Sequence, residues 1–415
     1  GFGSTLGSIG MTIIFGSIIA CSIRDSGAAK SMVNFFIKLF RGKNLELSTG
    51  MAAYIMSIPV FGDVTMVLIS PLCAIISKRQ NKPMGQMAAF TILALNLTHS
   101  MVPPTPGILA VAVLLGADLG LVILWGIVCS FIAYIITWIL MRKWAGKDYY
   151  PPKPEFVEGV EEVKSNDYHD LLIKEDNLPN VLFAMSPILV PVILIALASF
   201  ADMTMAEDAM ARVVLDTLGN RNIAMFLGMV FGWLLAVTHK EKALANYNQT
   251  SGKNEKSLFS MMFNGWVSEA LEVALVPLIV TGFGGGFAQI IKDAPAAGEL
   301  GDVVAATGFP GLLVPFVIGA AMECAVGSRT TAGMTAAGLC LPMLDSLGIS
   351  AVACTVMIGA GTMIVSHVND SGWWVSQSML NMDMTRTFKY NTLVGGVAGV
   401  IAGIVGAIFI TVGVM

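Results

Sequence analysis

The chain has 415 residues, of which 55% are hydrophobic and 13% are charged, and its formal net charge is −4. Soluble domains carry about 25% charged residues, so this composition excludes a soluble globular protein and predicts a polytopic helical membrane protein. The six cysteines lie in apolar segments without metal-ligand spacing, which indicates packing residues. We therefore expect no metal site, no cofactor and no nucleic-acid partner.

The first part of the chain predicts three apolar crossings, one amphipathic helix and one interrupted apolar segment. The crossings are expected at residues 1–21, 86–115 and 119–140. Residues 28–41 place Lys30, Asn34 and Lys38 on one helical face, which is typical of a helix lying in the membrane interface. Residues 50–77 are apolar but carry Pro and Gly within 59–63, which break a helix. A re-entrant hairpin with its tip at 59–63 is therefore expected.

A charged stretch with three prolines, residues 142–179, is the predicted linker to the second part. Further crossings are expected at 181–200, 223–238, 261–291 and 390–415. Residues 309–347 are apolar with an interruption at 327–331, which predicts a second hairpin. Residues 349–380 predict one more crossing, broken at 366–372.

Polar runs interrupt two of the predicted crossings, at residues 99–107 and 366–372. Lipid tolerates polar side chains at that depth only where they face protein, a ligand or a water-filled cavity. Ser, Asn, Asp and Gly also favour non-helical backbone. Two helices interrupted at matching places are the best sequence indication of a transporter binding site.

The two parts of the chain repeat one another. Asp25 matches Asp293 and His99 matches His367, and both pairs are 268 positions apart. We therefore divide the chain into a first repeat at 1–141, a linker at 142–179 and a second repeat at 180–415. The second repeat has three crossings before its hairpin and the first shows only one, so two further helices are expected to precede Gly1.

The placement of positive charge predicts the orientation of the repeats. If the linker is cytoplasmic, 20 of the 24 Lys and Arg residues fall in inward-facing loops, in accord with the positive-inside rule. The first hairpin then opens to the cytoplasm and the second to the exterior, so the repeats are inverted. This arrangement predicts a multi-pass protein of the inner (plasma) membrane with an external C-terminus.

The hairpin tips and helix breaks predict one site deep in the membrane. Helix N-termini suit a carboxylate, hydroxyl groups suit a polyol or hydroxy acid, and Arg329 could neutralise an anion. The predicted substrate-binding residues are Phe61, Gly62, His99, Pro104, Thr105, Gly327, Ser328, Arg329, Thr330 and Asn369. The predicted proton- or cation-coupling residues are Asp63, His367, Asp370 and Glu323. Structural alternatives stay open: the acids as helix caps, the histidines bonded to backbone carbonyls, and Glu323 paired with Arg329.

Several motifs resemble those of the gluconate permease family, the gluconate:proton symporters of the ion transporter superfamily. They are Gly3-Ser4-Thr5-Leu6-Gly7-Ser8, Phe61-Gly62-Asp63-Val64, His99 with Val102-Pro103-Pro104-Thr105-Pro106-Gly107, Gly116-Ala117-Asp118-Leu119-Gly120, Gly284-Gly285-Gly286-Phe287, Gly327-Ser328 and Ser366-His367-Val368-Asn369-Asp370-Ser371-Gly372. The resemblance implies proton-driven symport of a sugar acid or another small hydroxy carboxylate. It also implies a homodimer that works as an elevator, in which a transport domain slides past a scaffold.

The chain departs from the family's usual pattern at three positions. It has Thr105 where the family usually has His, Glu323 where a basic residue is usual, and Arg329 where a small residue is usual. An anionic substrate other than gluconate, and Na⁺ in place of H⁺, therefore stay open.

Other classes of function fit the sequence less well. A Na⁺/H⁺ antiporter of the same superfamily is the alternative within transport, with the Asp63 and Asp370 region binding only cations. An intramembrane hydrolase is disfavoured because the chain has neither a Gly-x-Ser-x-Gly nor a His-Glu-x-x-His motif, so we expect no enzymatic activity. A channel is disfavoured because the helix breaks form a repeat-related pair flanked by hairpins.

Overall fold

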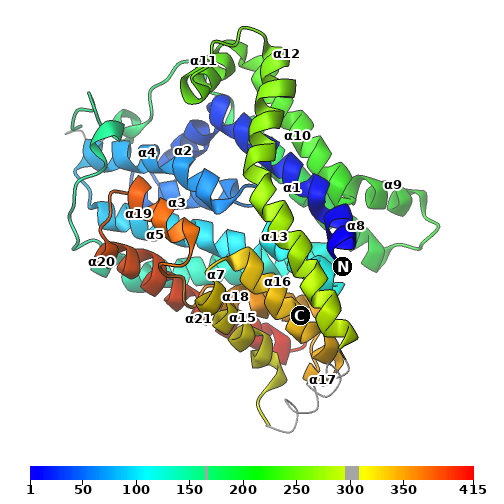
Figure 1. Cartoon of the computed structure of the whole chain (residues 1–415). Helices are drawn as coiled ribbons and strands as arrows, with labels where there is room; N and C mark the ends of the chain where they lie inside the picture. The colour runs from blue at the N-terminus through cyan, green and yellow to red at the C-terminus, as the bar shows by residue number, and fades with distance from the viewer. Residues whose placement is uncertain (164–166, 295–307) are drawn as a thin grey trace.

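The computed structural model describes residues 1–163, 167–294 and 308–415, and within these ranges the chain is helical and has no strand (Figure 1). Residues 164–166 of the predicted linker and residues 295–307 of the predicted second repeat lie outside the described part. Seven described segments are long and apolar enough to cross a membrane. They are Phe2–Asp25, Met84–Leu115, Leu119–Ala145, Val181–Thr204, Arg221–Thr238, Leu258–Ile291 and Met384–Thr411. The predicted crossings at these places are confirmed as apolar helices.

The first part of the chain forms the predicted elements in the predicted order. The amphipathic helix is α2(Ala28–Leu39), which follows α1(Phe2–Asp25) after Gly27. It buries Met32, Val33 and Phe36 and leaves Lys38 exposed, as its pattern predicts. Next come α3(Leu45–Met56), α4(Gly62–Gln80), α5(Met84–Met101), α6(Pro106–Leu115) and α7(Leu119–Ala145). The turn from α3 to α4 lies at the predicted hairpin tip, and α5 and α6 are the two parts of the first broken helix.

The second part begins with helices that the linker leads into. The linker contains the short helices η1(Pro154–Phe156) and η2(Tyr168–Leu171). It is followed by α8(Val181–Thr204), α9(Met210–Gly219), α10(Arg221–Thr238) and α11(Lys240–Ser251). A long helix then comprises α12(Leu258–Ser260), the π-helical turn η3(Met261–Trp266) and α13(Val267–Asp293). The helices α9 and α11 were not predicted, because neither is apolar enough to be read as a crossing.

The remaining helices form the second hairpin and the second broken helix. The hairpin comprises η4(Gly311–Leu313), α15(Val314–Val326), α16(Arg329–Cys340), η5(Leu341–Met343) and α17(Leu344–Leu347). The broken helix comprises α18(Ala351–Gly361) and α19(Ser371–Met379). The last crossing comprises α20(Met384–Thr387), the π-helical turn η6(Phe388–Leu393) and α21(Val394–Thr411).

The elements of the two parts correspond in order and in spacing. When the helix starts of α3, α4, α5, α6 and α7 are shifted by 268 positions, they fall within three residues of the starts of α15, α16, α18, α19 and α20. Leu45, for example, moves to 313, one position before Val314, and Leu119 moves to 387, three positions after Met384. The spacing found from two residue pairs therefore holds for these five pairs of helices.

Residues of the linker contact several basic loops, which lie on one face of the molecule. Glu175 forms ion pairs with Lys30 and with Lys242, the second at 2.9 Å, and Arg79 donates to the Leu172 carbonyl at 2.9 Å. Asp148, just after α7, binds Arg386 at 3.1 Å. In Figure 1 the linker runs along the left-hand side, whereas α9 and α17 lie at the right and lower right. Loops predicted to face one side of the membrane thus lie together.

These ion pairs also set the ionisation of the two linker acids. Burial raises the pKa of Asp148, but hydrogen bonds from Arg386 and Tyr390 outweigh it and hold the pKa below its usual range. Burial likewise raises the pKa of Glu175, and the ammonium groups of Lys30 and Lys242 lower it below its usual value. Both carboxylates are therefore charged at neutral pH.

The two broken helices lie in close contact. Gly359 of α18 packs so closely on the Ser100 carbonyl of α5 that a Cβ at this position would overlap it. Gly327, at the tip of the second hairpin, has φ +73° and packs against Asn369 in the same way. Glycine is required at Gly327 both by the left-handed backbone and by this contact. The close packing brings both breaks and the second hairpin tip into one region.

Candidate functional site

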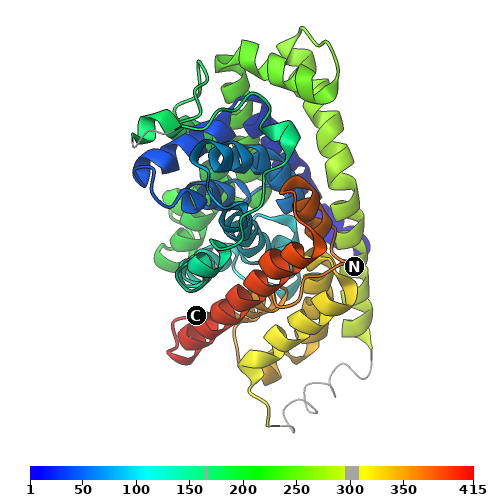
Figure 2. The same ribbon diagram turned by 90° about the vertical axis from the view of Figure 1, so that its left-hand side faces the viewer.

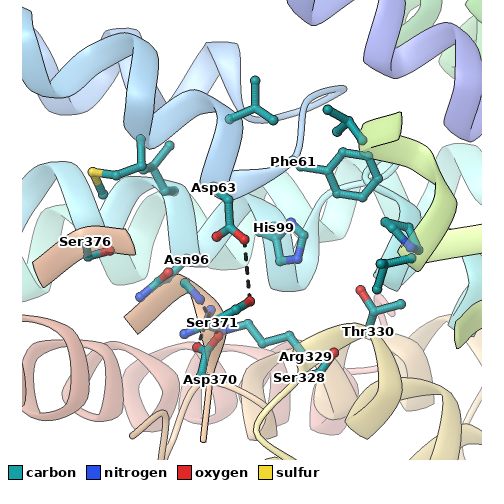
Figure 3. Close-up of a pocket in the computed structure, with 18 of the residues that line it drawn as sticks. Phe61, Asp63, Asn96, His99, Ser328, Arg329, Thr330, Asp370, Ser371 and Ser376 are labelled. Atoms are coloured by element: carbon teal, nitrogen blue, oxygen red, sulfur yellow. Dashed lines mark hydrogen bonds and ion pairs between the residues drawn. The ribbon is translucent and has the colours of Figure 1, made fainter. Parts of the chain in front are cut away.

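A cavity of about 420 Å³ lies where the hairpin tips meet the broken helices (Figure 3). Its polar lining comes from the start of α4, from α5, and from the starts of α16 and α19. The lining residues are Phe61, Gly62, Asp63, Val64, Met66, Leu95, Asn96, His99, Val273, Val276, Pro277, Val280, Ser328, Arg329, Thr330, Asp370, Ser371, Gly372 and Ser376. The helix α13, which runs along one edge of the molecule in Figure 2, contributes only apolar residues to this wall.

Three helices begin at this cavity. The first residues of α4 are Gly62-Asp63-Val64, those of α16 follow Ser328, and those of α19 follow Asp370. A helix N-terminus carries a partial positive charge and backbone N–H groups that lack helical partners. Ser328 and Asp370 cap their helices by accepting from the Thr331 and Gly372 amides at 3.4 and 2.9 Å. The start of α4 has no side-chain cap, so its first amides remain free to bind an anion.

One ion pair and one separate carboxylate carry the charge of the cavity. Arg329 Nη1 lies 3.3 Å from Asp370 Oδ2, and the two side chains are 9% and 7% exposed. Ser366 donates to the same carboxylate oxygen at 2.7 Å. Asp63 faces this pair across the cavity, and the Ser371 hydroxyl lies 3.5 Å from its carboxylate (Figure 3). Within the described ranges, no ion pair within 4.0 Å joins Asp63 to a base.

The second break places its polar side chains on two sides. Asp370 lines the cavity, the buried Ser366 hydroxyl donates to it, and Thr392 donates to the Ser366 carbonyl. His367 and Asn369 instead both contact the Cys324 carbonyl of α15, each at 3.1 Å. They therefore join the second hairpin to the break and do not line the cavity, which corresponds to the structural alternative considered for the histidines.

The first break lies behind the cavity wall. Thr105 is buried, and its hydroxyl donates to the Val102 carbonyl at 2.5 Å. Pro104 lies in the same turn, and neither residue reaches the cavity. His99, still within α5, does line the cavity, and Figure 3 shows its ring between Phe61 and Asp63.

Glu323 lies outside the cavity as well. It is completely buried on α15, and neither of its carboxylate oxygens has a hydrogen-bond partner among the described residues. The considered pairing of Glu323 with Arg329 is not the one formed, because Arg329 pairs with Asp370.

Eight of the predicted site residues therefore meet at one cavity, and six lie outside its lining. The eight are Phe61, Gly62, Asp63, His99, Ser328, Arg329, Thr330 and Asp370; the six are Pro104, Thr105, Gly327, Glu323, His367 and Asn369. Sequence reasoning did not single out Asn96 or Ser376 as site residues. Asn96 had a signal, because it is a polar residue three positions before His99 and so shares its helical face.

An all-helical membrane protein with a polar cavity between two broken helices has the architecture of a solute carrier. The fold is similar to that of the YdaH transporter of Alcanivorax borkumensis, with a TM-score of 0.62 and 16% sequence identity over 99% of this chain and 87% of that one.

The chain belongs to the GntP family of permeases, whose family model matches residues 1–413. It is 26% identical to a gluconate permease of Pseudomonas aeruginosa over 411 residues, which cover 99% of this chain and 85% of the relative. It is also 26% identical to the L-idonate transporter of the Gnt-II system of Escherichia coli K12, over 97% of this chain and 87% of the relative. The protein is thus an integral membrane permease and not an enzyme.

Proposed function

We propose that the protein imports a small hydroxy carboxylate of the sugar-acid class, such as gluconate, by proton-coupled symport. Relatives named for gluconate and L-idonate support the substrate class. The single observation that carries the proposal is the meeting of three helix N-termini and Arg329 in one cavity. The volume of about 420 Å³ lies within the roughly 300–1,000 Å³ of small-molecule pockets.

The polar groups of the cavity suit both ends of a sugar acid. The carboxylate is expected at the helix starts of α16 and α19, where amide groups and the Arg329 guanidinium can donate to it. Hydroxyl and amide groups from Ser328, Thr330 and Asn96 can bind the polyol chain. The apolar wall of α13 excludes water from the other side.

The charge balance of the cavity supports coupling to a cation. Arg329, Asp63 and Asp370 together carry a formal charge of −1, and an anionic substrate would make it −2. Uncompensated charge at this depth is unfavourable, so one positive charge should enter with each substrate. Asp63 is the proposed proton acceptor, because Asp370 already holds Arg329.

A proton suits Asp63 better than Na⁺ does. A sodium ion would need several oxygen ligands around this carboxylate, and among the described residues the hydroxyl that contacts Asp63 in the cavity is that of Ser371. The antiporter alternative is not favoured, since it would leave the anion-binding features of the cavity without a ligand.

We further propose that the two sets of helices are inverted repeats of an elevator-type homodimer in the inner membrane. The common spacing of the helices and the basic face along the linker support the inversion. The elevator is supported by the wall of α13: its lining residues are apolar, so the hairpins and broken helices can slide along it without losing hydrogen bonds there.

Uptake into proteoliposomes tests the transport proposal. An inward proton gradient should drive accumulation of labelled gluconate, and a Na⁺ gradient of equal size should not. Accumulation driven by Na⁺ alone would reassign the coupling ion. Cation exchange without any sugar-acid dependence would overturn symport in favour of the antiporter.

A further inference from the structure

A second, much smaller cavity lies directly behind the site. It measures about 10 Å³, and its lining includes His99, Ser100, Gly107, Arg329, Gly333 and Thr362. His99 and Arg329 are the two residues that line both cavities. Together they form the partition between the large cavity and the small one.

Three polar atoms of this lining are enclosed and lack a hydrogen-bond partner within the described ranges. They are His99 Nδ1, Ser100 Oγ and Arg329 Nε. Buried polar atoms in folded proteins are nearly always paired, with protein or with ordered water. Three such atoms, on residues that line one small cavity, indicate a shared ligand.

We propose that one ordered water molecule binds in this small cavity and joins His99 to Arg329. The volume of about 10 Å³ is close to the minimum of roughly 10–15 Å³ that a single water needs. A water molecule fits this cavity and a cation does not, because the Arg329 Nε–H group can only donate a hydrogen bond and a metal ion cannot accept one. The water accepts from Arg329 and donates to His99 Nδ1, and the Ser100 hydroxyl completes its partners.

This water fixes the state of His99 toward the substrate. Because Nδ1 accepts a hydrogen bond, the neutral ring carries its proton on Nε2. The ring then offers an N–H donor to the large cavity, where Figure 3 shows it between Phe61 and Asp63. Ser100 is thus a positioning residue, which acts on the substrate through His99 and Arg329. This consequence rests on the proposed binding of an organic anion in the large cavity.

An experimental structure of the purified protein, at a resolution that shows ordered water, tests the site itself. We expect a density peak within hydrogen-bonding distance of His99 Nδ1, Ser100 Oγ and Arg329 Nε. An empty cavity in a map that shows other buried waters would overturn the proposal. This result does not depend on whether the protein binds a sugar acid.

Gluconate binding to two variants tests the consequence. Ser100→Ala removes one partner of the water and should raise the dissociation constant roughly three- to tenfold, the equivalent of one hydrogen bond. Thr362→Val is the matched control, because the Thr362 hydroxyl lines the same cavity but already donates to the Gly359 carbonyl at 2.9 Å; its affinity should match the wild type. Equal affinity in Ser100→Ala and wild type would contradict the positioning role. If the wild type binds no sugar acid, the proposed function fails. The experimental structure then still tests the water by itself, because the density peak does not depend on substrate binding.

Discussion

The two broken helices stand at equivalent places in the chain but unwind to different extents. In the first, α5 continues to Met101 and α6 starts at Pro106, so the break spans residues 102–105. In the second, α18 stops at Gly361 and α19 starts at Ser371, so the break spans residues 362–370. The paired histidines consequently differ: His99 lies on a helix, and His367 lies on unwound backbone.

The local residues explain this difference. The first break contains two prolines, Pro103 and Pro104, and a third, Pro106, begins α6. Proline lacks an amide proton and ends a helix abruptly, and the Thr105 hydroxyl satisfies a carbonyl of its own turn. The second break has no proline; it follows Gly361 and contains Ser366, Asn369 and Asp370, short polar residues that bind backbone groups in non-helical conformations. In the first half His99 therefore stays on α5 and lines the cavity with Asp63, and in the second half Asp370 at the end of the break pairs with Arg329.

The largest expected effect concerns the ion pair at the second break, between Arg329 and Asp370. Arg329→Gln leaves Asp370 buried without a base, which should destabilise the fold by about 3–5 kcal/mol and weaken gluconate binding by about tenfold to a hundredfold. Thermal unfolding and equilibrium binding measure the two losses. The double variant with Asp370→Asn should recover the stability but not the affinity. Recovery of both would show that Arg329 serves only its ion pair.

Asp63→Asn should separate binding from coupling. A pH difference of one unit is worth about 1.4 kcal/mol, or about tenfold accumulation with one proton. The variant should keep gluconate exchange between the two sides and lose this accumulation. Asp118→Asn, which preserves the cap of α7 at Leu121, is the control. Normal accumulation by Asp63→Asn would move the proton to another group.

Removing one hydroxyl from each break should sharpen the contrast between them. Ser366→Ala takes a donor from Asp370 and should weaken gluconate binding several-fold. Thr105→Val removes a bond within its own turn and should lower stability by about 1 kcal/mol with the affinity unchanged. Dissociation constants and melting temperatures of both variants check this. A loss of affinity in Thr105→Val as large as that in Ser366→Ala would place the first break at the substrate.

The smallest expected effect concerns a contact between the halves outside the cavity. Asp148 after α7 binds Arg386 of α20, and its pKa is lowered by Arg386 and Tyr390 more than burial raises it. Its contribution, about 0.2–1 kcal/mol for such a partly exposed pair, is therefore present at neutral pH and lost as the pH falls below the usual carboxyl range. Asp148→Asn should melt slightly below the wild type at pH 7 and level with it in acid. A constant difference at every pH would exclude the ionised pair as the cause.

The sequence indicated the helical architecture and much of the cavity for identifiable reasons. Pro and Gly at 59–63 and the polar run at 366–372 stand out in apolar surroundings, so their positions predicted the tips and breaks. The sequence could not show that Arg329 pairs with Asp370 instead of Glu323, because that choice depends on how α16 packs against the second break. Nor could it show that Thr105 faces away from the cavity, because a four-residue break does not reveal its orientation.

The central claim is that the cavity at the starts of α4, α16 and α19 binds the substrate, with its carboxylate at α16 and α19. The most direct measurement is an experimental structure of the protein with gluconate bound. We predict density in the cavity of about 420 Å³, with the carboxylate at the starts of α16 and α19 beside Arg329 and the hydroxyl chain toward Asn96 and His99. Gluconate bound elsewhere, with this cavity unchanged and filled only by solvent, would contradict the account.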